Sequence, residues 1–172
     1  MKRHLILILI GIWLGSVGLA PGSLQEYSQA VKYARAGQAD FAFMYFNKLL
    51  RNYPKSKYRD QALFATGEYY FGNFGLKQAE SAFQAFVDEY PDSNERLYAL
   101  AYLLSVARKN NDEARVSGLE KQIIDLQQVS LIFRKTKETS FTSPLHQFHK
   151  AIIYIDKIEF FVEGELFAKV SY

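Results

Sequence analysis

Histidines are the first residues to consider for chemistry, and two of the three in the chain, His146 and His149, stand three residues apart. That spacing can place two metal ligands on one face of a helix. No acidic residue nearby completes a His-Glu-x-x-His type of site, and the third histidine, His4, belongs to an apolar N-terminal segment. We therefore expect histidines that serve packing or solubility, and no metal site.

The other candidate groups also lack the residues that would complete a catalytic or phosphate-binding site. The carboxylate pairs Asp88-Glu89 and Asp112-Glu113 stand at the ends of expected helices, where Asp112 and Glu113 suit a helix N-terminus electrostatically. The glycines of residues 72–75 are not followed by the Lys-Ser or Lys-Thr of a phosphate-binding loop. Nothing assembles a nucleophile, a base and an orienting group, so the sequence predicts no catalytic residues, no cofactor and no enzyme.

The composition of the chain excludes further kinds of functional site and partner. The chain has no cysteine, which excludes disulfides, thiol catalysis, cysteine-ligated zinc, iron–sulfur clusters and a bacterial lipid anchor. Its net charge is +3, and residues 23–128 carry 13 basic and 13 acidic side chains. Because no block of like charge remains, we expect no nucleic-acid partner.

The N-terminus has the three-part layout of a secretory signal. Lys2 and Arg3 precede an apolar run from Leu5 to Leu14, and small residues follow as far as Gly22. Cleavage after Gly22 or Gly18 is one interpretation, and an uncleaved anchor is the other. Residues 1–22 are therefore predicted to be a signal peptide or anchor, which gives the only membrane contact and places the rest outside the cytoplasm.

A repeat organises the middle of the chain. Tyr53-Pro54-Lys55-Ser56 recurs as Tyr90-Pro91-Asp92-Ser93, a shift of 37 residues. Apolar side chains before each copy follow helical spacing, each run ends at a proline, and the serine is a good N-cap for the next helix. Each unit is expected to be two helices: 24–36 with 39–52, then 57–71 with 76–89, then 94–109 with a helix from 113 to about 129.

These residues resemble the tetratricopeptide repeat, whose pattern the second copy matches at Gly67, Tyr70, Ala79, Phe83 and Pro91. The 37-residue period and the Gly-Glu-Tyr-Tyr of residues 67–70 resemble periplasmic repeat proteins of the outer-membrane-assembly and Tol–Pal envelope systems. The chain lacks the lipid-anchor cysteine of the outer-membrane-assembly members. The resemblance implies a mainly α, helical-hairpin solenoid of about three repeats over residues 23–128.

The resemblance also implies a binding surface for a protein or peptide. In this family the first helix of each repeat lines a concave face, and Gly67 and Tyr70 would lie on a different face of their helix, which packs inward. The surface lacks a cluster of lysines and arginines, so an extended or helical apolar segment is the expected ligand. The predicted partner-binding residues are Tyr27, Val31, Phe64, Glu68, Phe71, Tyr98 and Arg108. The alternative for Phe64 and Phe71 is that they pack against the C-terminal appendage, with the hairpin at 157–172 as their cover.

Residues 129–172 form a C-terminal appendage. Residues 135–144 are polar and predict a loop, after which Ser143-Pro144 could start a short helix through about Lys150. Two runs of strand formers, 157–162 and 166–172, flank Glu163-Gly164-Glu165 and predict a β-hairpin. A helix over 145–162 is an alternative that the pattern leaves open. An isolated hairpin is marginal in water, so it must dock on the repeats or pair with another chain.

Together these features predict a non-catalytic, exported scaffold that mediates protein–protein contacts in the bacterial cell envelope. The alternative is a structural subunit of an envelope assembly, in which the C-terminal hairpin pairs with a neighbouring strand. The sequence names neither the partner nor the oligomeric state.

Overall fold

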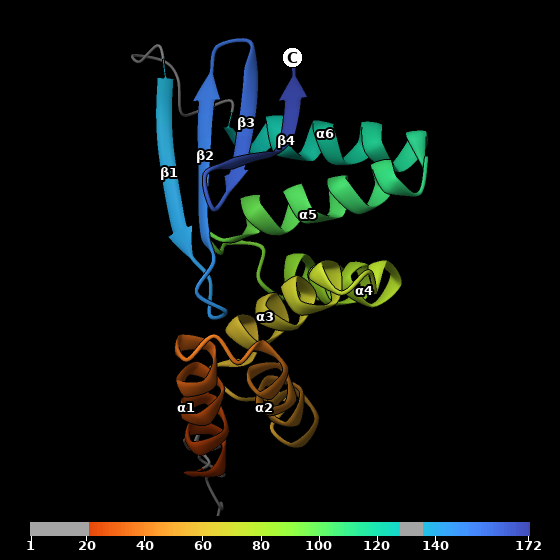
Figure 1. The fold of residues 1–172 in the computed structure, drawn as a ribbon. Helices are drawn as coiled ribbons and strands as arrows, with labels where there is room; N and C mark the ends of the chain where they lie inside the picture. The colour runs from red at the N-terminus through yellow and green to blue at the C-terminus, as the bar shows by residue number, and fades with distance from the viewer. Residues whose placement is uncertain (1–20, 128–135) are drawn as a thin grey trace, which may run out of the picture.

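Six helices form three consecutive hairpins in the computed structural model, which describes residues 21–127 and 136–172. Their bounds are α1 Pro21–Arg35, α2 Ala39–Asn52, α3 Arg59–Gly72, α4 Leu76–Glu89, α5 Arg96–Lys109 and α6 Glu113–Gln127. The hairpins stack in chain order, from α1 and α2 at one end to α5 and α6 at the other (Figure 1). The predicted solenoid of helical hairpins is confirmed.

The 37-residue period is also a feature of the backbone. Gly37, Phe74 and Asn111 end the first helix of each hairpin with positive φ angles of 69°, 60° and 55°. After each of these three residues, the next backbone N–H donates a hydrogen bond of 2.8 to 3.0 Å to a carbonyl in the last turn of the helix. The donor and acceptor pairs are Gln38 to Tyr33, Gly75 to Tyr70 and Asp112 to Ala107. Each first helix therefore ends in the same left-handed turn, although a glycine occupies it in the first repeat alone.

The serines of the Tyr-Pro-x-Ser closures do not act as the predicted N-caps. The helices that follow begin three residues after them, at Arg59 and Arg96. Each serine hydroxyl instead accepts the N–H two residues further on, Ser56 from Tyr58 and Ser93 from Glu95, both at 3.2 Å. The serines shape the connecting turn, because their side chains bond locally before the helix starts.

Helices α3 and α4 cross closely at Gly67, as predicted. A Cβ atom on Gly67 would lie 2.8 Å from the ring of Phe83, which is fully buried. The Phe83 ring also stacks on Tyr102 of α5, with centroids 4.4 Å apart and planes at 9°. Gly67 therefore makes room for an aromatic ring that links two successive repeats.

The C-terminal appendage is a four-stranded antiparallel sheet in the order β1-β2-β3-β4. Its strands are β1 Thr136–Thr142, β2 Phe148–Tyr154, β3 Lys157–Val162 and β4 Glu165–Ser171. The predicted hairpin is confirmed as β3 and β4. Its two turn residues, Glu163 and Gly164, both have positive φ, at 51° and 84°, which is the geometry of a tight type I′ hairpin turn.

Two predictions for the appendage are wrong. The polar loop expected over 135–144 is largely β1. The short helix after Ser143 is replaced by a turn and the start of β2, and the helical alternative over 145–162 is replaced by β2 and β3. In β2 the buried residues are His149, Ala151 and Ile153, and the residues between them are half-buried. This two-residue period is that of a strand with one covered face, and β1 tolerates polar residues because it is an edge strand.

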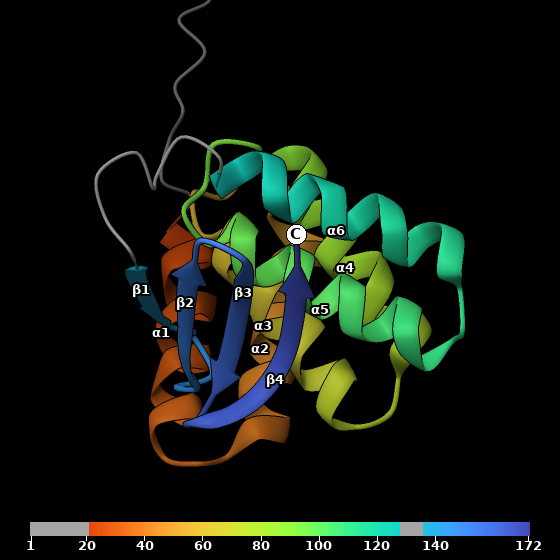
Figure 2. The ribbon, with the colours of Figure 1, turned by 90° about the horizontal axis from the view of Figure 1, so that it is seen from above.

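The sheet lies along one side of the helical stack (Figures 1 and 2). Its inner face joins the main hydrophobic core with Phe64, Tyr98 and Tyr102 of α3 and α5. The inner residues come from three neighbouring strands: Ala151, Ile153, Ile158, Phe160, Ala168 and Val170. The appendage therefore docks on the repeats, one of the arrangements that the sequence left open.

The predicted targeting segment lies almost wholly outside the described residues. Residues 1–20 are not described, and Pro21 and Gly22 begin α1. Of the helices that the structure describes, none combines the length and apolar character needed to cross a membrane. Cleavage and anchoring therefore both stay predictions.

Candidate functional site

The sheet covers the centre of the expected binding face. Phe64, Glu68 and Tyr98 were expected to be accessible in a groove, and they are 1%, 3% and 3% exposed. Phe64 has ring contacts with Phe141 of β1 and with His149 of β2, at centroid distances of 5.0 and 5.8 Å. The expectation of an open groove at these three residues is wrong, because the chain's own sheet occupies it.

Two further predicted contact residues hold the sheet in place. Phe71 is partly buried and packs against Phe167 of β4, with ring centroids 5.5 Å apart. The Arg108 guanidinium donates a hydrogen bond to the Lys169 carbonyl of β4 at 2.8 Å, and pairs with Glu120 at 2.7 Å. Both side chains therefore bind the sheet, the position in which a partner was expected.

Tyr27 and Val31, the last two predicted contacts, line a cavity of about 460 Å³ that the sheet leaves open. The cavity lies between α1, the start of α3, the N-terminal end of α5 and the β1–β2 turn. Tyr27 stacks on Tyr58 with ring centroids 4.1 Å apart, and its hydroxyl donates to the Gln61 side-chain oxygen. The cavity is a part of the concave face that remains available to another molecule.

The polar lining of this cavity includes two carboxylates. Asp60, in the first turn of α3, and Glu95, just before α5, both line it. Burial raises the pKa of the Asp60 carboxyl above its ordinary value of 3.8, and the charge of Glu95 adds to the increase. Backbone N–H groups of Asp60 and Gln61 oppose the increase but do not cancel it. Arg35 and His146 are the basic or titratable residues among the other lining side chains.

A buried polar cluster joins the repeats to the sheet beside the cavity. Glu68 Oε1 lies 3.0 Å from His149 Nε2, and the Tyr102 hydroxyl lies 3.1 Å from the same nitrogen. His149 Nδ1 lies 3.1 Å from the Gln147 carbonyl, which can only accept, so Nδ1 carries a hydrogen. Nε2 is then either the acceptor for Tyr102 or, when protonated, the donor to Glu68.

Burial governs the electrostatics of this cluster. Burial raises the pKa of the Glu68 carboxyl above its ordinary value of 4.5, and contacts with His149 lower it in part. The pKa of Tyr102 is raised well above 10.0, chiefly by burial and then by the charge of Glu68. The Glu68 and His149 side chains are 0% and 2% exposed, so no substrate reaches them. The cluster therefore attaches the sheet and has no access for catalysis.

The Glu68–His149 pair was missed from the sequence, where His149 was considered only as a surface or packing histidine. A usable signal existed in residues 148–154. His149 is in phase with Ala151 and Ile153 at the two-residue period of a strand, which places it on the covered face. A buried histidine needs a polar partner, and an acidic residue inside the helical repeat is the natural one to seek.

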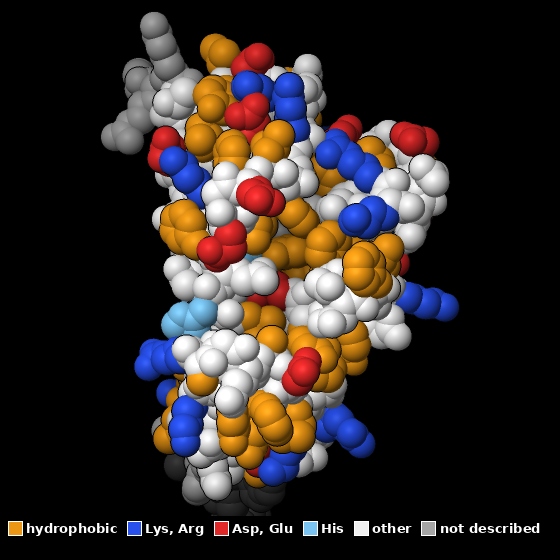
Figure 3. Space-filling model, viewed as in Figure 1, with side chains coloured by type: hydrophobic (Ala, Val, Ile, Leu, Met, Phe, Trp, Pro, Cys, Tyr) orange, Lys and Arg blue, Asp and Glu red, His pale blue; other side chains and the backbone are white. Residues whose placement is uncertain are grey.

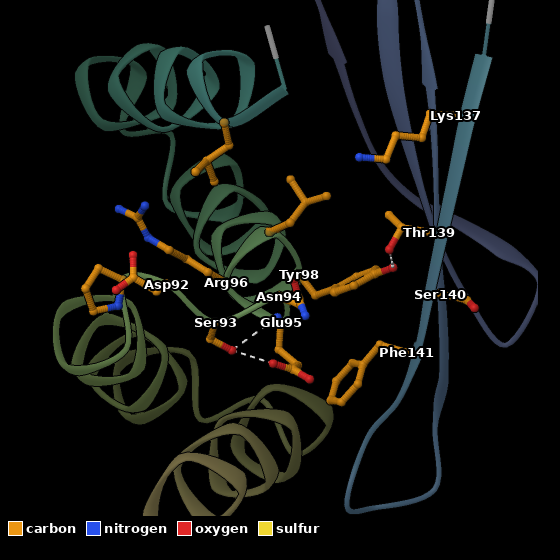
Figure 4. Close-up of a pocket in the computed structure, with 13 residues that line it drawn as sticks. Asp92, Ser93, Asn94, Glu95, Arg96, Tyr98, Lys137, Thr139, Ser140 and Phe141 are labelled. Atoms are coloured by element: carbon orange, nitrogen blue, oxygen red, sulfur yellow. Dashed lines mark hydrogen bonds between the residues drawn. The ribbon is translucent and has the colours of Figure 1, made fainter. Parts of the chain in front are cut away.

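A second and larger cavity, of about 690 Å³, lies between β1 and the α4–α5 connection (Figure 4). Tyr98 reaches across from α5, and its hydroxyl lies 3.3 Å from the Thr139 hydroxyl of β1. Ser93 and Glu95, joined by a hydrogen bond, form part of the opposite wall. Lys137, Thr139, Ser140 and Phe141 of β1 form its other wall.

No metal site is formed by the described residues, among which no three histidine, aspartate or glutamate side chains come close enough to share an ion. His146 lies in the β1–β2 turn with a positive φ of 65°, apart from the buried His149. The two histidines that were considered as a pair therefore belong to different environments.

Comparison with known proteins identifies the repeat. The family model of the tetratricopeptide repeat matches residues 61–93, which cover α3, α4 and the start of the next connection. No curated protein matches the sequence significantly. The match indicates no enzymatic family, and such repeats are typical of scaffolds that bind other proteins. The family model therefore matches one of the three helical hairpins, and the other two hairpins have the same two-helix arrangement.

Proposed function

We propose that this protein is an exported, non-catalytic scaffold of the bacterial cell envelope, which binds a protein partner in the open cavity beside α1. One observation carries the proposal. The sheet fills the concave face over α3 and α5 but leaves a cavity of about 460 Å³ against α1 and the start of α3. Tyr27 and Val31, the contacts expected in the first repeat, line that cavity.

The envelope address is supported by the sequence alone. Basic residues Lys2 and Arg3 precede the apolar segment and then small residues, which is the order of an export signal. The resemblance to periplasmic repeat proteins of outer-membrane assembly and of the Tol–Pal system supports the same compartment. In this proposal any contact with the membrane is made through residues 1–22.

Partner capture can be tested at Val31 in intact cells. A photoreactive amino acid at Val31, in the full chain, should give a discrete crosslinked product with one protein, because the side chain lines the open cavity. The control places the same group at Lys121 on α6, where the side chain is 75% exposed and remote from the cavity. Equal products at both positions, or none at Val31, would contradict a partner in the cavity.

Export can be tested separately. A reporter fused after Tyr172 should be active outside the cytoplasm, and reversing the basic end with Lys2→Glu and Arg3→Glu should impair export, since that end orients the segment. Activity of the reporter in the cytoplasm would remove the envelope from the proposal and leave the scaffold role.

The alternative, a structural subunit that pairs strands with a neighbour, is favoured by the edge of β1. This strand pairs with β2 on one side, and none of the described strands pairs with its other side. At the opposite edge of the sheet, Arg108 already binds the Lys169 carbonyl of β4. Val31→Glu separates the two roles. If the protein is a scaffold, the variant should lose capture of its partner. If the protein is a structural subunit, the variant should assemble as the parent does.

A further inference from the structure

We infer that the open cavity receives a basic side chain, a lysine or an arginine, from an otherwise apolar segment of the partner. The inference rests on the proposed function, because it names the chemistry of what the cavity binds. It departs from the expectation that the ligand is recognised by apolar contacts alone.

The charged groups that line the cavity are two carboxylates, Asp60 and Glu95, and one guanidinium, Arg35, on the α1 wall. Asp60 Oδ1 is shielded from water and has no hydrogen-bond partner in the structure. Glu95 accepts a hydrogen bond from the Ser93 hydroxyl, and neither carboxylate forms an ion pair with any residue in 21–127 or 136–172. A carboxylate that is cut off from water on one oxygen gains from a cation that binds at the other.

The basic groups already in the cavity do not serve Asp60. Arg35 lines the α1 wall, and its charge acts on Tyr27, whose pKa it lowers against a larger increase caused by burial. The charge that acts on the Asp60 carboxyl is that of Glu95, which has the same sign. An acidic ligand side chain would therefore meet two like charges, whereas a basic one would compensate both.

The aromatic walls favour the same kind of ligand. Phe64 and Phe141 line the cavity and meet edge to face at 5.0 Å, and the Tyr27 ring lines it on the α1 side. Aromatic faces attract a guanidinium or an ammonium group and also accept the apolar stem that carries it. The cavity thus offers apolar walls and an acidic wall to one long basic side chain.

The test uses a display library of random dodecapeptides as the probe. Peptides are selected from this library for binding to the full-length protein. Asp60→Asn keeps the shape of the side chain and removes its charge, so the variant should fold as the parent does. The matched control is Asp88→Asn on α4, an exposed carboxylate that accepts from Gln84 and lies outside the cavity. A second variant, Glu95→Gln, tests the other carboxylate.

The expected result is enrichment of peptides that carry a lysine or arginine next to apolar residues. The affinity of such a peptide, measured by titration, should fall at least about tenfold on Asp60→Asn, the size of effect that loss of one charge-assisted hydrogen bond gives. The same peptide should bind Asp88→Asn unchanged, and replacing its basic residue with glutamine should weaken it by a similar factor.

Three outcomes would overturn the inference. Enriched peptides without a basic residue, or equal binding to Asp60→Asn, would show that the cavity recognises apolar segments only, with the scaffold role intact. Failure to enrich any peptide would also overturn it, and crosslinking at Val31 would then decide whether the scaffold role stands. If neither experiment detects binding, the proposed function fails as well.

Discussion

Glu68 and His149 are 81 positions apart in the chain, and their Oε1 and Nε2 atoms lie 3.0 Å apart inside the contact between α3 and β2. The pair lies beneath the sheet, and Tyr102 of α5 joins it through its hydroxyl. Three elements that are distant in sequence therefore share one buried polar contact. A mispaired sheet would leave these groups without partners, so the cluster favours one way of docking.

The stability of the protein should depend on pH through Glu68. Burial raises the pKa of this carboxyl in the folded state above its ordinary value of 4.5. The carboxyl therefore stabilises the fold fully below pH 4.5, and this contribution is lost as pH rises through the folded-state pKa. The slope cannot exceed about 1.4 kcal/mol per pH unit for one proton.

Urea unfolding of the parent and of Glu68→Gln at a series of pH values measures this contribution. The difference in unfolding free energy, parent minus variant, should decrease as pH rises above 4.5. Glu165→Gln, an exposed carboxylate at the start of β4, is the control and should give a flat difference. A difference for Glu68→Gln that grows with pH would mean that the carboxylate form is the stabilising one.

Phe64 should act as a core residue rather than as a docking residue. Its ring contacts Phe83, Phe86, Tyr102, Phe141 and His149, and its exposed fraction is 1%. Phe64→Ala should lower the free energy of unfolding by about 3–5 kcal/mol, the range for a large buried ring. Phe148→Ala, at a ring 44% exposed on the outer face of the sheet, is the comparison and should cost far less. Thermal unfolding that separates the two variants by only a few degrees would contradict the covered groove.

Two glycines in helices should respond to alanine in opposite directions. A Cβ at Gly67 would lie 2.8 Å from the fully buried Phe83 ring, so Gly67→Ala should destabilise the fold by about 1–3 kcal/mol through overpacking. A Cβ at Gly118, inside α6, meets nothing within 4 Å, so Gly118→Ala should stabilise by about 0.5–1 kcal/mol. Denaturant midpoints with unchanged slopes would measure both; equal effects would mean that α3 and α4 do not cross at Gly67.

The protein should be more stable with glycine in place of Phe74. Phe74 holds a left-handed φ of 60° at the end of α3 while its side chain is 89% exposed, so the ring contributes little packing and the backbone conformation is costly. Phe74→Gly should therefore raise the melting temperature, whereas Phe74→Ala, which keeps a Cβ, should not reproduce the gain. A lower melting temperature for the glycine variant would show that the exposed ring stabilises the turn.

The repeat was predictable because helix punctuation and apolar spacing are local properties. The prolines at 54 and 91 and the apolar positions between them located α3 and α4 to within about two residues, and Gly67 indicated their close crossing. The serine caps failed for a local reason as well. Ser56 and Ser93 bond to the N–H groups of the turn that precedes the helix, a competition that residue preference alone does not resolve.

The candidate site was less predictable because accessibility is a tertiary property. Phe64, Glu68 and Phe71 do share one side of α3, but what covers that side depends on residues more than 70 positions later. Strand β1 was the decisive omission. Its sequence, with four threonine or serine residues in seven, has the composition of a loop, and only pairing with β2 makes it a strand.

The sheet that docks over α3 and α5 competes with any other molecule for the surface of these helices. It is tethered to the helices through residues 128–135, so its effective concentration at that surface is of the millimolar order typical of short tethers. A free segment with micromolar affinity, present at micromolar concentration, competes poorly against such an internal ligand. An outside molecule can occupy the part of the concave surface against α1 as it stands, but it reaches the part under the sheet only by displacing a piece of the same polypeptide.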